Sequence, residues 1–177
     1  MIKPHRFISA HNVLWARLLD GQPAFITRRR ARGAKARGVT YERKVHEYLQ
    51  ERLIGLPQVD YRESPWVEFK DTFGVRYCQP DAFILDLEHK RLYVVEVKYR
   101  HSEEAWWQLW RLYIPLAKKL YEGFACGALE VCKWFDPSTK FPGECVLTKD
   151  PLYIPDASLT AVHIFNPQRQ KAYASGI

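Results

Sequence analysis

The sequence has no run of about 18 apolar residues, so no segment is expected to cross a membrane as a helix. It contains no phosphate-binding Walker loop, which argues against intrinsic ATP use. The first residues lack the compact apolar segment and small-residue cleavage site of a secretory signal. We therefore expect a cytoplasmic protein without a membrane anchor, in the host cytoplasm if a phage encodes it.

Metal-binding and disulfide patterns are also missing. The four cysteines form no CxxC pair and lie in apolar contexts, so we expect reduced and mostly buried thiols. The six histidines show no spacing typical of a zinc site. Any metal in this protein is therefore expected to have oxygen ligands.

Positive charge is in excess. The chain has 27 Lys and Arg against 20 Asp and Glu, which gives a formal net charge of +7. An excess of this kind attracts polyanions, and nucleic acid is the first partner to consider. The length of 177 residues and the hydrophobic content of 47% suit one domain with a full core.

Residues 79–100 contain two apolar segments joined by a polar turn, which predicts two neighbouring strands. The second segment, 92–97, is almost continuously apolar, as expected for a strand covered on both faces. Glu96 and Lys98 interrupt the run, and they point to the same face because strand side chains alternate. Asp81, at the start of the first segment, can approach both. A buried, unpaired carboxylate costs several kcal/mol, so we expect a divalent cation here.

Helices and strands are predicted along the rest of the chain. Apolar residues at three-to-four spacing predict helices at 40–55 and 102–121. Thr40 is expected to cap the first helix, and Pro115 is expected to kink or break the second. Strands are predicted at 66–70, 75–78, 81–86, 92–99, 128–135, 144–148 and 161–165. This order predicts an α/β fold with a mixed central β-sheet flanked by helices.

Two parts of the chain are expected. Residues 1–38 are predicted to form an N-terminal helical extension, with a short helix around Asn12 to Leu19, followed by a basic linker. Residues 39–177 are predicted to form the main domain. The linker carries six cations among small residues and has no apolar face, so we expect it to bind nucleic acid, with a solvated linker as the alternative. The six cations are Arg28, Arg29, Arg30, Arg32, Lys35 and Arg37.

The spacing of the charged residues suits metal-assisted phosphodiester hydrolysis. Asp81 and Glu96 offer carboxylates and Val97 offers a backbone carbonyl, and Mg²⁺ (or Mn²⁺) is satisfied by a few oxygen ligands plus water. Lys98 is expected to orient or help deprotonate the attacking water and to stabilise negative charge. Glu42 is a further candidate ligand, and its alternative role is to interact with the positive end of its helix.

These residues resemble the PD-(D/E)xK nuclease superfamily. Pro80 and Asp81 match its first signature, and Glu96, Val97 and Lys98 match its second, which ends an apolar strand as in the family. The resemblance covers about residues 38–135. It implies a restriction-endonuclease-like αβββαβ core of helix, three strands, helix and strand, and a metal site at Asp81 and Glu96.

Within the superfamily, the chain is most similar to the RecB-like and phage exonuclease branch. Gly38 to Glu42 forms the GxxxE element that opens the first helix in that branch. Gln108 and Tyr113 resemble the branch's QxxxY pair, with one residue more between them. Gln108 is therefore a candidate for the active site or for nucleic-acid contact. Tyr113 is a candidate for the core or for nucleic-acid contact, and Trp107 is the tryptophan most suited to stacking on bases.

The function expected from these features is a Mg²⁺-dependent DNA nuclease, encoded by a phage or mobile element and acting in DNA processing, recombination or degradation. It is expected to work with DNA as a homo-oligomer or in a larger phage or recombination complex. Two alternatives stay open at this point. One is a non-catalytic nucleic-acid-binding or virion-associated protein on the same fold, and the other is an RNA endonuclease of the same superfamily.

Overall fold

The computed structural model describes residues 8–27, 34–152 and 156–168. The helical elements are α1 (Ala34–Leu53), α2 (Glu103–Gln108), the π-helical turn η1 (Leu109–Tyr113) and α3 (Ile114–Leu120). The strands are β1 (Trp15–Leu19), β2 (Val59–Glu63), β3 (Trp66–Asp71), β4 (Gly74–Cys78), β5 (Ala82–Asp86), β6 (Arg91–Arg100), β7 (Ala125–Trp134), β8 (Cys145–Thr148) and β9 (Thr160–Ile164). Every predicted strand is present, with ends that agree within three residues.

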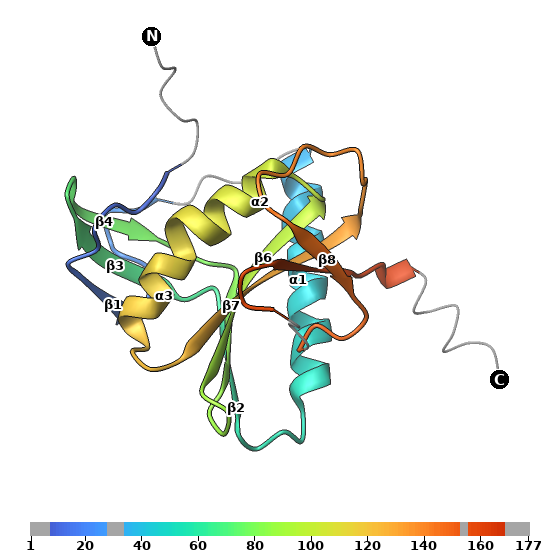
Figure 1. Ribbon diagram of the computed structural model, residues 1–177, viewed down its shortest axis with the longest axis horizontal. Coiled ribbons are helices and arrows are strands. Elements are labelled where there is room, and N and C mark those ends of the chain that lie inside the picture. Colours follow the sequence, from blue (N-terminus) through green and yellow to red (C-terminus); the bar gives the residue numbers. More distant parts are fainter. Residues whose placement is uncertain (1–7, 28–33, 153–155, 169–177) are drawn as a thin grey trace, which may run out of the picture.

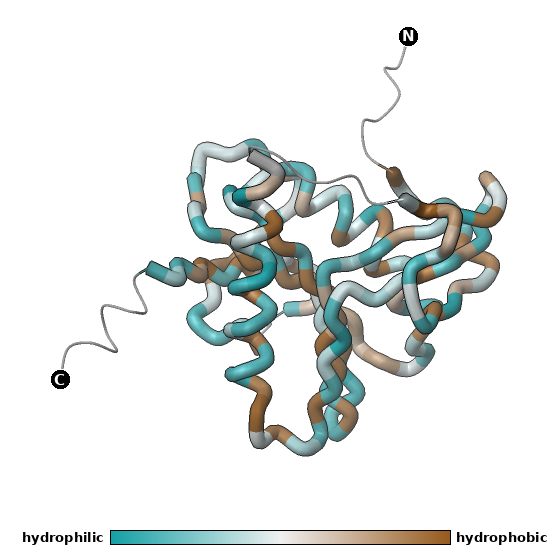
Figure 2. The backbone as a smooth tube through the Cα atoms, turned by 180° about the vertical axis from the view of Figure 1, so that it is seen from behind, coloured by the Kyte–Doolittle hydropathy of each residue, from teal (hydrophilic) through white to brown (hydrophobic). Residues whose placement is uncertain are grey.

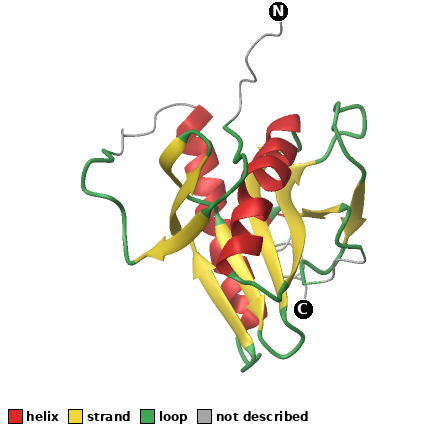
Figure 3. Cartoon of the chain, turned by 60° about the vertical axis from the view of Figure 1, so that its left-hand side comes forward, coloured by secondary structure: helices red, strands yellow, loops and turns green. Residues whose placement is uncertain are grey.

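The central sheet has six strands in the order β2-β5-β6-β7-β9-β8. Strands β2, β5 and β6 are antiparallel, whereas β6, β7, β9 and β8 are parallel to one another. Helix α1 covers one face of the sheet and the continuous α2-η1-α3 segment covers the other (Figures 1 and 3). The predicted mixed α/β fold is thus confirmed. Along the chain, the central sheet and its helices follow the order helix, three strands, helical segment, three strands.

A second sheet of three strands, in the order β1-β3-β4, packs beside the first. The predicted hairpin of β3 and β4 is confirmed, with its turn at Asp71 to Gly74. The helix predicted around Asn12 to Leu19 is wrong, because this segment forms β1 and pairs with β3. The partly buried side chains of Ala16 and Leu18 alternate with the exposed ones of Trp15 and Arg17, as in a strand.

Helix α1 starts at Ala34 and not at the predicted Thr40. The hydroxyl group of Thr40 donates a hydrogen bond to the carbonyl of Ala36, so Thr40 lies within the helix and does not cap it. The added turns contain alanine, lysine and arginine, which favour helix formation without an apolar face. Lys35 and Arg37 therefore belong to α1. The other four cations of the predicted linker lie outside the described residues.

The second helix is interrupted as Pro115 predicted, by a π-helical turn just before the proline. The N–H group of Ile114 donates to the carbonyl of Leu109, five residues earlier. Proline has no N–H group for the carbonyl of Arg111, which in a regular helix would accept from residue 115. The N–H group of Ala10 fills this position, with a nitrogen-to-oxygen distance of 2.7 Å.

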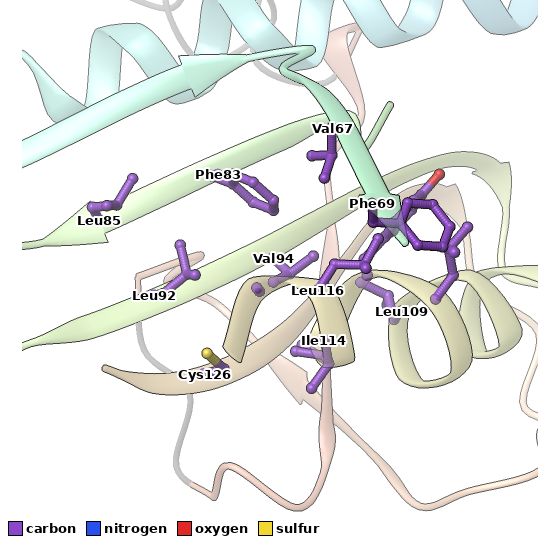
Figure 4. Packing of buried hydrophobic residues seen from close by; sticks show 14 residues of the cluster. Val67, Phe69, Phe83, Leu85, Leu92, Val94, Leu109, Ile114, Leu116 and Cys126 are labelled. Atoms are coloured by element: carbon purple, nitrogen blue, oxygen red, sulfur yellow. The ribbon is translucent and has the colours of Figure 1, made fainter. Parts of the chain in front are cut away.

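Two apolar clusters hold these layers together. Between the sheet and the α2-η1-α3 segment, Phe83, Leu92 and Val94 pack against Leu109 and Leu116 (Figure 4). On the other face, Val45 and Leu49 of α1 pack against residues of β5, β6 and β7. The rest of α1 is mostly hydrophilic (Figure 2). No helix in the described ranges is long and apolar enough to cross a membrane.

Truncating Phe83 to alanine is expected to destabilise the fold by about 3–5 kcal/mol, because the ring is fully buried and its removal leaves a cavity. Urea unfolding measures the change. Phe73→Ala serves as the matched control, because its ring is 71% exposed and the same truncation leaves no cavity there. Equal losses for both variants would contradict the assignment of Phe83 to the core.

Candidate active site

Strands β5 and β6 bring the two signature carboxylates together. Ala82 pairs with Val95 in antiparallel register. Asp81, one residue before Ala82, therefore lies beside Glu96, one residue after Val95. The Oδ2 atom of Asp81 accepts a hydrogen bond from the N–H group of Val97 at 2.6 Å. This bond fixes the Asp81 carboxylate against the β6 backbone, at the segment that also carries Lys98.

Glu96 is 2% exposed, and its two carboxylate oxygens have different surroundings. Oε1 lies 2.7 Å from the Nζ atom of Lys98. Oε2 is buried and has no hydrogen-bond partner among the described residues. An unpaired carboxylate oxygen in the interior is costly, so this position favours a cation or an added hydrogen-bond donor.

Burial and mutual repulsion keep both acids from ionising easily. The pKa of Asp81 is well above its ordinary value, first because of burial and then because Glu96 and Glu42 lie nearby. Burial raises the pKa of Glu96 to about 7, although Lys98 acts in the opposite direction. For Lys98 the balance is reversed: its pKa is raised, because the attraction of Glu96, Glu104 and Asp81 outweighs its burial. The site thus holds one ammonium group among several acids.

A chain of hydrogen bonds holds Lys98. Its Nζ atom donates to Oε1 of Gln108 at 2.6 Å, and Nε2 of Gln108 approaches the hydroxyl oxygen of Tyr113 at 3.5 Å. The Tyr113 hydroxyl group donates to the carbonyl of Gln79 at 3.3 Å. Gln79 precedes Pro80, so the chain of bonds connects β6, the α2-η1 junction and the segment before β5.

The π-helical turn explains the extra residue between Gln108 and Tyr113. In an α-helix, side chains four residues apart share a face, but side chains five residues apart do not. Turn η1 lies between these two positions and contains one additional residue per turn. It therefore brings Gln108 and Tyr113 to the same side, and the one-residue difference from the QxxxY pattern has a structural cause.

Tyr113 lies in the core, which is one of its two predicted environments, and its contact with nucleic acid stays a prediction. The residue is only 4% exposed, so the ring packs in the core and the hydroxyl group alone reaches Gln108. Trp107 is half-buried, with its indole N–H group donating to Glu103. The guanidinium group of Arg111 lies 5.7 Å from the centroid of the Trp107 ring. Contact of Trp107 with nucleic acid stays a prediction.

Glu42 lies at the margin of the site. Its charge raises the pKa of Asp81, which places the two carboxylates within electrostatic reach. Its Oε1 atom is 3.7 Å from Nε2 of His46, one helical turn along α1. The Nδ1 atom of His46 lies 2.5 Å from the hydroxyl oxygen of Tyr61 in β2. Glu42 thus lies on α1 within electrostatic reach of Asp81, and its role as a further ligand stays a prediction.

Two acids of the site were not predicted. Glu130 is fully buried in β7 and pairs in parallel register with Glu96. Its Oε2 atom lies 2.7 Å from Nδ1 of His101, and its other oxygen has no hydrogen-bond partner in the described structure. Glu104 lies 3.9 Å from the Lys98 amine. A lone glutamate in the apolar run 128–132 is the same signal that identified Glu96, and it would have identified Glu130.

The acids fit a cation with few protein ligands. No group of three or more His, Cys, Asp or Glu side chains within the described ranges converges into a complete metal site. Asp81 and Glu96 nevertheless combine an orphaned oxygen with raised pKa values, and both features are relieved by a nearby positive charge. Mg²⁺ keeps several waters and needs one or two carboxylates, so this pair and the Val97 carbonyl match its donor set.

Replacing Glu96 with glutamine is expected to flatten the pH dependence of stability in metal-free buffer. The Glu96 pKa is about 7 when folded, against an ordinary value of 4.5, so the folded state binds its proton more tightly. The resulting stabilisation is present at low pH and is lost as the pH rises through the folded pKa. Urea unfolding at about pH 5 and about pH 8 compares the two proteins. An equal change in both would contradict a raised pKa.

Comparisons with known proteins give little further assignment. No family model matches the sequence, and no curated protein matches it. The chain is similar in structure to a type III CRISPR defence DNA nuclease activated by cyclic oligoadenylate, with a TM-score of 0.41 and 14% sequence identity. The match covers 83% of this chain and 21% of that protein, so the chain spans about a fifth of its length. The roles assigned above rest on the geometry of this chain.

Proposed function

We propose that this protein is a divalent-metal-dependent nuclease that hydrolyses phosphodiester bonds in DNA. The observation that supports it most is the meeting of Asp81 and Glu96 from neighbouring strands, with the ammonium group of Lys98 at 2.7 Å from Glu96. Buried Glu96 and half-buried Asp81, both with raised pKa values, together with the ammonium group of Lys98, suit a reaction in which negative charge develops on a phosphate.

Asp81, Glu96 and the carbonyl of Val97 would hold the metal, with Glu42 as a further ligand from α1. A divalent ion at this place supplies Lewis-acid stabilisation of the phosphate and activation of water. The role of the protein is to hold the two carboxylates in position while Oε2 of Glu96 has no other partner in the described structure. The hydrogen bond from the Val97 N–H group fixes Asp81, and burial between the layers fixes Glu96.

Lys98 is proposed to orient the attacking water and to stabilise the charge of the transition state. Its raised pKa keeps the amine protonated at neutral pH, so it acts as a hydrogen-bond donor and as a positive charge. Gln108 holds the amine through its Oε1 atom, and Tyr113 connects Gln108 to the Gln79 carbonyl. This arrangement limits the movement of Lys98 before the substrate binds, which is favourable for catalysis.

DNA as substrate is supported by charge. The net charge of +7 attracts a polyanion over distances of about one Debye length, roughly 8 Å at physiological salt. Arg37 in the exposed start of α1, and Lys35 beside it in the chain, are proposed to contact the backbone. Such contacts give salt-sensitive binding with little sequence preference, so cleavage of many sequences is expected.

Asp81→Asn, Glu96→Gln and Lys98→Met are each expected to lower cleavage by at least about 100-fold in Mg²⁺, because each removes one charge from the reacting centre. The assay uses purified protein with linear double-stranded, single-stranded and branched DNA and with RNA. Asp86→Asn and Lys118→Met are matched controls, since Asp86 is at the far end of β5 and Lys118 is exposed on α3.

Full cleavage by all three site variants would contradict the proposal, provided that circular dichroism shows the same fold as the parent. Binding of DNA without cleavage under any divalent metal would favour a non-catalytic nucleic-acid-binding protein. Cleavage of RNA alone would favour an RNA endonuclease on the same fold.

Mg²⁺ is expected to raise the melting temperature of the parent, because a ligand that binds only the folded state adds about 2.7 kcal/mol at 100 times its Kd. Asp81→Asn and Glu96→Gln are expected to lose this response. Asp86→Asn keeps the site intact and should respond as the parent does. A rise of the same size in all four proteins would show that the ion binds elsewhere.

A further inference from the structure

A second, cationic pocket lies on the α1 side of the sheet. It has a volume of about 310 Å³, and its lining includes Arg37, Tyr41, Lys44, Tyr99 and Lys133. The ring of Tyr99 meets that of Tyr41 edge to face, with 5.7 Å between the centroids. Tyr99 follows Lys98 in β6, and neighbouring strand residues point to opposite faces. The pocket is therefore separated from Lys98 by the sheet.

The charge of this pocket is unbalanced. Arg37 and Lys44 come from α1 and Lys133 comes from β7, whereas the lining contains no aspartate or glutamate. None of these three side chains takes part in an ion pair within the described ranges. Three cations around one cavity repel each other unless an anion lies between them.

One of the three cations, Lys133, contacts the Tyr99 side chain directly. The Nζ atom of Lys133 lies 3.3 Å from the hydroxyl oxygen of Tyr99 and 5.1 Å from the centre of its ring. Lys133 is thus held against the aromatic wall of the pocket, with its ammonium group beside the cavity.

The donors present suit a phosphate group. An arginine offers a planar pair of N–H donors that matches phosphate oxygens, and lysines add point charges. The hydroxyl group of Tyr99 accepts from Lys133, so its own hydrogen can be donated to the same ligand. A carboxylate ligand could bind to the same cations. We favour phosphate because the positive net charge of the chain already favours nucleic acid as a partner.

We propose that this pocket binds a phosphate group of a nucleotide, contributed either by a free mononucleotide or by the backbone of a bound nucleic acid strand. The second source rests on the proposed nuclease function, whereas the first does not. A strand anchored here would run along the start of α1. The same helix carries Glu42, which lies within electrostatic reach of Asp81.

Fluorescence anisotropy tests the proposal with a labelled eight-nucleotide single strand in EDTA, where no cleavage occurs. Lys133→Gln and Arg37→Gln are each expected to weaken binding of the strand, of AMP, or of both by about tenfold, because each removes a charge-assisted hydrogen bond. Lys118→Gln removes the same charge from exposed α3, on the opposite face, and is expected to bind like the parent.

Competition separates the two sources. Displacement of the strand by AMP but not by adenosine would identify a free nucleotide phosphate as a ligand. Loss of strand binding in the two variants without any binding of AMP would identify the backbone. Unchanged binding of both probes in Lys133→Gln and Arg37→Gln would overturn the proposal.

Because these measurements exclude metal, they are independent of the cleavage assay. If the protein binds phosphate in this pocket but cuts no nucleic acid, the pocket proposal holds and the nuclease proposal fails. If the protein cuts normally while both variants bind as the parent does, the nuclease proposal holds and the pocket proposal fails.

Discussion

Two neighbouring carboxylates, buried Glu96 and half-buried Asp81, need positive charge, and the surrounding structure supplies it only in part. Lys98 compensates for Glu96 at one oxygen, while the other oxygen has no partner in the described structure. Asp81 has a single backbone donor and two acidic neighbours. A core built only for stability would place apolar residues here, since paired buried charges seldom improve on them. The imbalance is the feature from which the metal site is inferred.

The central acids were predictable because their signal is local. A strand that is apolar at 92–97 except for one glutamate, followed by a lysine two residues later, fixes both side chains on one face without knowledge of the fold. A mixed sheet with covering helices also followed from periodicity, whereas the order of its strands did not. Glu130 carries the same signal as Glu96, yet only the parallel register of β6 and β7 shows that the two glutamates are neighbours.

Other features depend on contacts that no local pattern contains. Segment β1 has a spacing that suits a helix weakly, and pairing with β3 decides in favour of a strand. Strand β2 has the polar sequence VDYRE and was not predicted, because its hydrogen bonds come from pairing with β5, which no local pattern shows. The early start of α1 is set by helix propensity in a segment whose sequence has no apolar stripe, so apolar periodicity cannot locate it.

The π-helical turn changes the direction in which side chains point before and after it in the α2-η1-α3 segment. Gln108 must face Lys98, while Leu116 must face the apolar core eight residues later, and a regular helix advances by about 100° per residue. One added residue shifts everything after it by that angle. The Arg111 carbonyl, which Pro115 leaves without a donor in the helix, accepts a hydrogen bond from the Ala10 N–H group. The functional face and the packing face of this helix can therefore evolve separately, since the turn between them absorbs the difference in register.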